Sequence, residues 1–205
     1  MDYTKLAAKE TVIKVIGALT SRNVEAMMVE TKEEALAKIK ELIPPGAGVM
    51  NGSSRTLEEI GFVEYLKSGT HGWNNLHEAI LAEKNIAEQA KLRKQAALSD
   101  FYLGSVHALA QTGEMVIASN SGSQLPHVVY TSPNLLLVVG TQKIMPTLED
   151  ALKRLKDYVA PLEDTRMKDA YGVGTNLSKM LIFNYEHPML GRHVRVIFVN
   201  QKLGF

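Results

Sequence analysis

The sequence predicts an α/β fold in which a mostly parallel central sheet is flanked by helices. Amphipathic helical patterns alternate with short apolar strands, which is typical of parallel strands joined by crossover helices. Residues 135–139 form a continuous apolar run, as expected for a strand that is covered on both faces. Several strands also end in a loop of small residues that leads into a helix. In this fold class ligands bind beyond the carboxyl ends of the strands.

The first half of the chain is expected to be rich in helices. Apolar residues at helical spacing predict a helix over about 4–21, and the apolar segment 24–29 predicts a strand. Thr31 and Glu34 have the spacing of a capping box and indicate the start of a helix, which the Pro-Pro-Gly at 44–46 ends. The other elements expected in this half are a strand at 48–50, a helix from about 55 and a charged amphipathic helix over 85–98.

The second half carries the clearest strands. Thr147 and Asp150 indicate the start of a helix that continues to about residue 159. No long helix separates the last two strands, so we expect them to pair as an antiparallel extension of the sheet. The apolar pattern places the strands at 100–103, 114–118, 135–139, 180–183 and 194–199.

No linker, repeat or low-complexity tract divides the 205 residues. A chain of this length and ordinary composition is typical of one domain, with or without a small appendage. We therefore assign residues 1–22 to an N-terminal helix and residues 23–205 to a single α/β domain.

The composition argues against several classes of function. Lys and Arg number 23 and Asp and Glu 22, and this balance argues against nucleic-acid binding. The chain has no cysteine, which excludes a Cys-ligated metal or an iron–sulfur cluster held by this chain. No segment approaches the roughly 20 apolar residues of a membrane span, and the first residues lack the apolar core of a secretory signal. We predict a cytoplasmic protein with no membrane or nucleic-acid partner and no metal site, since the histidines form neither HxH nor HExxH.

Loops that follow four of the predicted strands are expected to meet at one edge of the sheet. Glycine lets the backbone approach a ligand, and hydroxyl groups, free N–H groups and basic side chains can hold an anion. Ser54 also has a purely structural interpretation as a helix cap. The candidate ligand-binding residues are Gly52, Ser53, Ser54, Arg55, Asn120, Ser121, Gly122, Ser123, Gln124, Gly140 and Lys143.

Three residues are candidates for catalysis. Glu114 starts a predicted strand and is the candidate carboxylate nucleophile, with an exposed turn residue as the plain alternative. His107 and His127 lie in or beside the candidate edge and are candidates for a general acid or base. A structural or surface role is the more common outcome for a single histidine.

Several motifs occur in a characteristic order. They are NGSSRTLEEIGF at 51–62, SDFYLG at 99–104, AQTGEMV at 110–116, VVGTQKIMPTLEDA at 138–151 and VIFVNQKLGF at 196–205. Together they resemble the LUD (lactate-utilisation) domain family, from about residue 25 to the C-terminus. Two positions depart from the family pattern. Glu114 stands where many relatives carry a small or hydroxyl residue, and residues 119–124 replace an acidic-Gly-Asn signature.

The resemblance implies a fold related to the superfamily of glucosamine-phosphate deaminase, ribose-phosphate isomerase and CoA-transferase. It also implies a cytoplasmic role in bacterial L-lactate oxidation, with iron–sulfur oxidoreductase subunits as partners. On this hypothesis the chain binds a small anionic ligand, and the identity of any cofactor stays open. A homodimer is plausible, because most soluble oligomers are symmetric dimers, but no sequence feature indicates it.

Two alternatives to this hypothesis stay open. The first is an independent enzyme of the superfamily, either an acyl-CoA transferase with Glu114 as nucleophile or a sugar-phosphate isomerase. The second is a non-catalytic interaction subunit.

Overall fold

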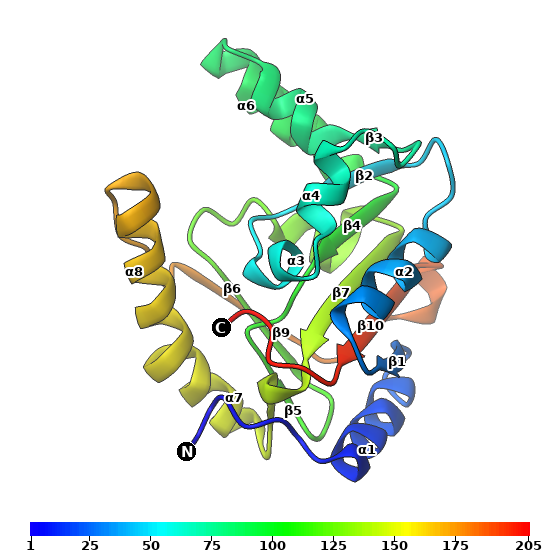
Figure 1. The fold of residues 1–205 in the computed structure, drawn as a ribbon, viewed down its shortest axis with the longest axis vertical. Helices are drawn as coiled ribbons and strands as arrows, with labels where there is room; N and C mark the ends of the chain where they lie inside the picture. Colours follow the sequence, from blue (N-terminus) through cyan, green and yellow to red (C-terminus); the bar gives the residue numbers. More distant parts are fainter.

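The computed structural model describes residues 1–205 and contains two β-sheets (Figure 1). The central sheet has six strands, and all of its neighbouring pairs are parallel. In spatial order the strands are β1 (Glu25–Val29), β10 (His193–Val199), β7 (Asn134–Gly140), β4 (Phe101–Gly104), β2 (Gly48–Asn51) and β3 (Asn74–Asn75). The predicted fold class, a mostly parallel sheet flanked by helices, is confirmed.

A second sheet of four strands lies against one face of the first. Its central strands pair antiparallel, and β5 also pairs parallel with β8. In spatial order its strands are β8 (Ile144–Met145), β5 (Ala108–Ala110), β6 (Met115–Ser119) and β9 (Lys179–Phe183).

The predicted pairing of the last two strands is wrong. β9 is an edge strand of the second sheet and lies antiparallel to β6, whereas β10 lies between β1 and β7 in the central sheet. The burial of the two strands accounts for the difference. Phe198 and Val199 of β10 face opposite sides of the central sheet and are both fully buried, but Met180 of β9 is half exposed. A strand that is apolar on both faces is stable only between two covered faces.

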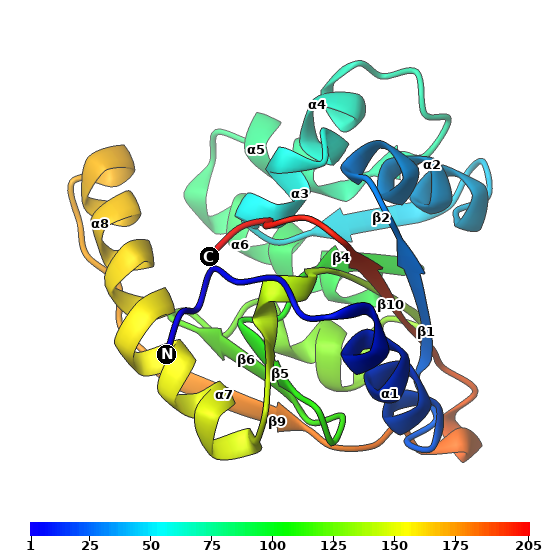
Figure 2. The ribbon, with the colours of Figure 1, turned by 60° about the horizontal axis from the view of Figure 1, so that its bottom comes forward.

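The elements pack in layers, which are clearest in Figure 2. Helices α2 to α4 cover one face of the central sheet, and α1 together with the second sheet covers the other. The outer face of the second sheet packs against α7 and the π-helical segment η4. The helices are α1 (Lys9–Thr20), α2 (Lys32–Leu42), α3 (Arg55–Glu59), α4 (Phe62–Lys67), α5 (Leu76–Ala82), α6 (Ile86–Gln95), α7 (Leu148–Arg154), η4 (Leu155–Val159) and α8 (Ala160–Tyr171). Short helical turns are η1 (Ala96–Leu98), η2 (His127–Thr131), η3 (Thr141–Lys143) and η5 (Pro188–Leu190).

Helix starts follow the capping residues. Thr31 and Glu34 form the predicted capping box of α2, with the Glu34 N–H 3.2 Å from Thr31 Oγ1. Thr147 caps α7 through a single hydrogen bond, which its Oγ1 accepts from the Asp150 N–H at 3.1 Å. The predicted helix that begins there does not end at residue 159, because it continues through η4 into α8.

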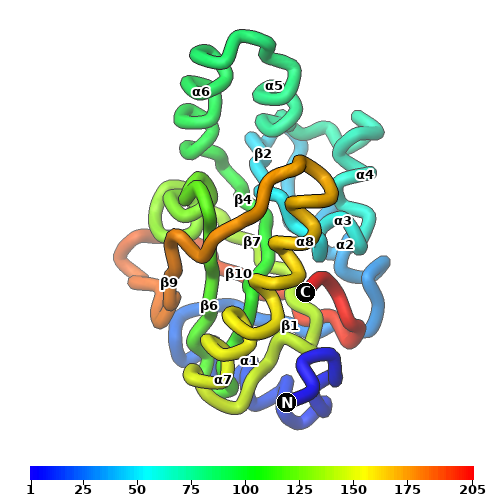
Figure 3. The backbone as a smooth tube through the Cα atoms, turned by 90° about the vertical axis from the view of Figure 1, so that its left-hand side faces the viewer, coloured from blue at the N-terminus to red at the C-terminus, as the bar shows by residue number.

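Two parts of the chain extend from this layered body. Helices α5 and α6 project together at one end of the molecule, and α8 runs across the side that faces the viewer in Figure 3. None of the residues of α6 or α8 is buried. No helix is both long enough and apolar enough to cross a membrane.

Candidate functional site

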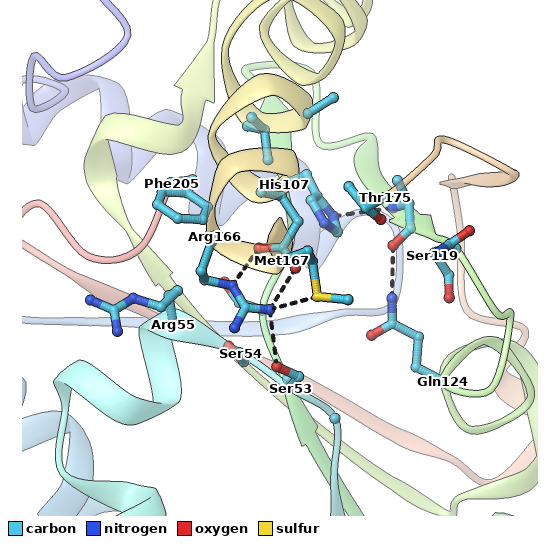
Figure 4. A pocket seen from close by; sticks show the side chains of 18 of the residues that line it. Ser53, Ser54, Arg55, His107, Ser119, Gln124, Arg166, Met167, Thr175 and Phe205 are labelled. Carbon is cyan, nitrogen blue, oxygen red and sulfur yellow. Dashed lines mark hydrogen bonds and ion pairs between the residues drawn. The ribbon is translucent and has the colours of Figure 1, made fainter. Parts of the chain in front are cut away.

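A cavity of about 460 Å³ opens at the carboxyl edge of the central sheet, beside the second sheet. The loops that follow β2, β4 and β6 line it, together with η3, and α8 forms its outer wall (Figure 4). Volumes of this size are typical of pockets for small molecules. The location agrees with the expected position of ligand sites in open α/β sheets.

Lys143 lies at the bottom of this cavity, where η3 follows β7. Its side chain is 3% exposed, and Nζ donates to Thr56 Oγ1 at 3.0 Å, Ser105 Oγ at 3.1 Å and the Val106 carbonyl at 3.2 Å. All three partners are neutral oxygens. Burial, together with the positive charge of Arg154, lowers the pKa of Lys143 to about 7, although Glu59 opposes this. The charge of Lys143 therefore has no counter-ion in hydrogen-bond contact.

Two glycines allow close packing of the chain, Gly140 against residues 201–203 and Gly204 against Lys143. At Gly140 a Cβ would lie 2.8 Å from the Gln201 carbonyl and 2.9 Å from the Leu203 nitrogen, so a side chain does not fit there. Gly140 is thus a packing residue at the end of β7 and does not line the cavity. The second glycine, Gly204, has a φ of +62°, which favours glycine.

His107 reaches the same cavity from the segment between β4 and β5. Its Nδ1 accepts a hydrogen bond from the Ala118 N–H at 3.1 Å, which leaves Nε2 as the protonated nitrogen of the neutral ring. Burial and the nearby charges of Lys143 and Arg154 lower the pKa of His107 to about 3. Arg154 also donates to the backbone carbonyl of His107. His107 is therefore a neutral N–H donor at physiological pH.

Lys143, Thr56, Ser105 and His107 are called the cavity floor below. Tyr102 of β4 also lines the cavity and was not expected there. Its ring stacks on His127 with the centroids 4.4 Å apart, and burial raises the pKa of its hydroxyl. A Cβ at Gly52 would lie 2.6 Å from the Tyr102 hydroxyl, so only glycine fits beside it.

His127 has a structural role in the fold. Its Nδ1 lies 3.2 Å from Ser99 Oγ and 2.9 Å from Ser132 Oγ, and burial lowers its pKa to about 4. It does not line the cavity, but its ring stacks on that of Tyr102, which does.

The wall formed by α8 adds charged groups that the sequence did not indicate. Arg166 donates to both carboxylate oxygens of Glu163, at 2.7 Å and 2.6 Å, and to Ser53 Oγ at 3.4 Å. The Asp164 carboxylate accepts from the Thr175 N–H at 2.8 Å and holds the segment after the helix. Figure 4 shows Arg166 extending from α8 toward Ser53. The only sequence signal for this wall is the Glu163–Arg166 spacing on a helix.

Most of the predicted ligand-binding residues line the cavity. The position of Ser54 is compatible with both capping and ligand binding. Its Oγ accepts from the Leu57 N–H at 3.3 Å as the cap of α3, and the residue also lines the cavity. Gly122 forms a turn with a φ of +87° against Lys179 and does not line the cavity. The predicted residues that line the cavity are Gly52, Ser53, Ser54, Arg55, Asn120, Ser121, Ser123, Gln124 and Lys143.

Glu114 lies outside the cavity, in the turn between β5 and β6. Its carboxylate pairs with Arg22 at 2.6 Å and accepts a hydrogen bond from Thr112. Arg22 also donates to the carbonyls of Thr112 and Asn184, at 2.8 Å and 2.6 Å. This geometry links the end of α1 to the second sheet.

The fold and the site define an open-sheet α/β protein with a polar small-molecule cavity at its carboxyl edge. The model of the LUD domain matches residues 12–180, and the chain belongs to the LUD domain family. No curated protein matches its sequence at a significant level.

Two solved structures are similar to the chain, to different extents. A DUF162 family protein from Deinococcus radiodurans is similar over 96% of this chain and 100% of its own, with a TM-score of 0.55 and 10% identity. At this identity the likeness shows the fold alone. The beta subunit of eIF2B from Chaetomium thermophilum is 14% identical, with a TM-score of 0.33 over 58% of this chain and 44% of its own.

Proposed function

We propose that the chain binds a small organic anion in the cavity and serves the oxidation of L-lactate or a related organic acid. The observation that carries this proposal is the buried Lys143 side chain, which in its protonated form has only neutral oxygens as hydrogen-bond partners. A buried charge without a counter-ion is costly. A bound carboxylate would supply the missing negative charge.

The rest of the cavity has the chemistry to hold such a ligand. Ser53 and Ser54 present hydroxyl groups on one side and Ser121 and Ser123 on the other. Arg166 adds a guanidinium group at the wall, although Glu163 neutralises part of its charge. Charge-assisted hydrogen bonds of this kind are the stronger ones in proteins. Affinity for the anion is then local, as the nearly balanced net charge requires.

The redox step in this proposal belongs to partner subunits. The chain has no cysteine, so a cysteine-ligated iron–sulfur cluster has to be held by another chain. On this proposal the protein works in the cytoplasm and presents or releases an organic acid to iron–sulfur oxidoreductase subunits. A symmetric homodimer and the relationship to the CoA-transferase superfamily remain part of the same hypothesis.

The alternative of an acyl-CoA transferase gains no support from the geometry. Glu114 is paired with Arg22 outside the cavity. Glu163 is the single carboxylate residue that lines the cavity, and Arg166 holds both of its oxygens. Neither carboxylate is free to act as a nucleophile in this arrangement.

Thermal unfolding with and without ligand tests the proposal. We expect L-lactate, pyruvate or phosphate to raise the Tm, because a ligand that binds only the native state stabilises it. Lys143→Met should lose this response. Lys156→Met, which changes an exposed lysine on η4, should keep it. If no such anion raises the Tm of the wild-type chain, the proposal is wrong.

A further inference from the structure

The hydrogen bonds around Lys143 accommodate a neutral amine without leaving a buried group unpaired. Ser105 donates its hydroxyl proton to the Val138 carbonyl at 2.6 Å, so its oxygen accepts from Lys143. The Val106 carbonyl can only accept. Thr56 Oγ1 has no other partner, so its proton is free to point at the nitrogen lone pair. Two N–H groups and one lone pair are thus all satisfied.

His107 supplies the complementary group in the same cavity. Its Nδ1 is occupied by the Ala118 N–H, so Nε2 carries the proton, and Nε2 has no hydrogen-bond partner in the protein. Burial and two neighbouring positive charges keep this ring neutral. A neutral N–H donor of this kind polarises a carbonyl oxygen without carrying a charge of its own.

We propose that Lys143 condenses with the carbonyl carbon of a 2-oxo acid to form an imine, while the Nε2–H of His107 holds the carbonyl oxygen. The inference rests on the proposed function and deepens it. Oxidation of a 2-hydroxy acid yields a 2-oxo acid, and only the oxidised member of that pair has the carbonyl group that an amine attacks. The site would therefore distinguish the product of the oxidation from its substrate.

The condensation balances without any further reagent. The lone pair of the neutral amine forms the N–C bond, and the electrons of the carbonyl bond move to its oxygen. The C–O bond then breaks, and both hydrogens of the amine leave with that oxygen as one water molecule. No electrons are exchanged with another group. The lowered pKa of Lys143, about 7, makes the unprotonated amine accessible at neutral pH.

The cavity also suits the rest of such a ligand. Lys143 is the only lysine that lines it, so a ligand in the cavity can condense with this residue alone. The carboxylate of the ligand would lie among the hydroxyl groups of Ser53 and Ser54, within reach of Arg166. A protonated imine keeps a positive charge near that carboxylate.

Reductive trapping of the full-length chain tests the inference. The protein is incubated at neutral pH with pyruvate or L-lactate and cyanoborohydride, and adducts are located by intact mass and peptide mapping. We expect pyruvate to add the mass of one pyruvic acid less one oxygen atom, at Lys143, and lactate to add nothing. Lys156→Arg should keep the adduct and Lys143→Arg should lose it. His107→Gln should slow trapping on the order of tenfold or more, and an unchanged trapping rate would overturn the role of His107 in the condensation.

The outcomes separate this inference from the function on which it rests. A Tm shift with pyruvate but no adduct overturns the imine and leaves anion binding intact. The absence of an adduct, together with no Tm shift from pyruvate, L-lactate or phosphate, overturns both. An adduct spread over surface lysines also overturns the imine. The peptide map of the wild-type chain decides this even if Lys143→Arg fails to fold.

Discussion

Gly204 packs directly against Lys143 at the floor of the cavity. A Cβ at this position would lie 3.2 Å from Lys143 Nζ and 2.5 Å from Thr56 Oγ1. The Gly204 N–H also donates to Glu59 Oε2 at 2.7 Å. The backbone at residue 204 therefore closes one side of the lysine, and a side chain there would displace the hydroxyl that Lys143 needs.

Gly204→Ala is expected to destabilise the protein and to weaken its response to anions. The φ of +62° alone should cost about 1 kcal/mol, and the contact with Thr56 adds to this. Gly46→Ala is the matched control, because its φ is +81° and a Cβ there meets nothing within 4 Å. Urea unfolding and the Tm shift with phosphate measure both effects. Equal losses for the two variants would contradict the close contact at residue 204.

Lys143 should make the free energy of unfolding depend on pH between about 7 and 10. Its folded pKa of about 7 lies below its ordinary value of 10.5, so between these values the unfolded chain binds the extra proton. Stability should therefore rise with pH across this window, relative to Lys143→Met, by up to about 1.4 kcal/mol per pH unit. Urea unfolding at several pH values from 7 to 10 measures the difference. Parallel curves would show that the lysine keeps an ordinary pKa.

Glu114→Gln is expected to affect stability and not ligand binding. Partial burial raises the pKa of Glu114, but hydrogen bonds from Thr112 and Arg22 outweigh this and hold it below 4.5. The variant should lose about 1 kcal/mol at pH 7, since Arg22 keeps its two backbone partners. The difference from wild type should shrink as the pH falls below about 4.5, where the carboxylate becomes protonated. A lost Tm response to anions would instead place Glu114 in the functional site.

Arg166→Met is expected to weaken anion binding about tenfold, which is about 1.4 kcal/mol. The substitution removes a positive charge from the cavity wall and frees the Glu163 carboxylate to repel an anion. Titration calorimetry with phosphate measures the affinity. Arg195→Met is the control, because Arg195 pairs with Glu25 and does not line the cavity. Unchanged affinity in Arg166→Met would show that α8 does not contribute to binding.

Local patterns were sufficient to predict most of the elements. The apolar runs of β7 and β10 and the caps of α2 and α7 lie where the sequence indicated, because burial and capping are decided by nearby residues. The pairing of β9 was not predictable in this way. Periodicity shows that a segment is a strand, but its partner is chosen by the packing of distant parts of the chain.

Only part of the cavity could be predicted, because local patterns do not show which distant residues come together. Lys143 and Ser54 could be named because each follows a strand end. The chemistry of His107 depends on the Ala118 N–H and on the charges of Lys143 and Arg154. All three are distant from His107 in the sequence, so no local pattern connects them to it. The α8 wall gave little signal, since none of its residues is buried and no apolar stripe marks it.

Because β1 lies at the edge of the central sheet, it cannot pair until β10 has been synthesised. β1 pairs only with β10, and Val29 lies beside Val199. A nascent chain therefore exposes β1 and the inner side of α1 on the ribosome until nearly all of these residues have been translated. Pairings between such distant segments form slowly, and the apolar surface that is exposed until then can aggregate or bind chaperones. Slower translation of the segment before residue 193 would lengthen this vulnerable interval, and the yield of folded protein should fall with it.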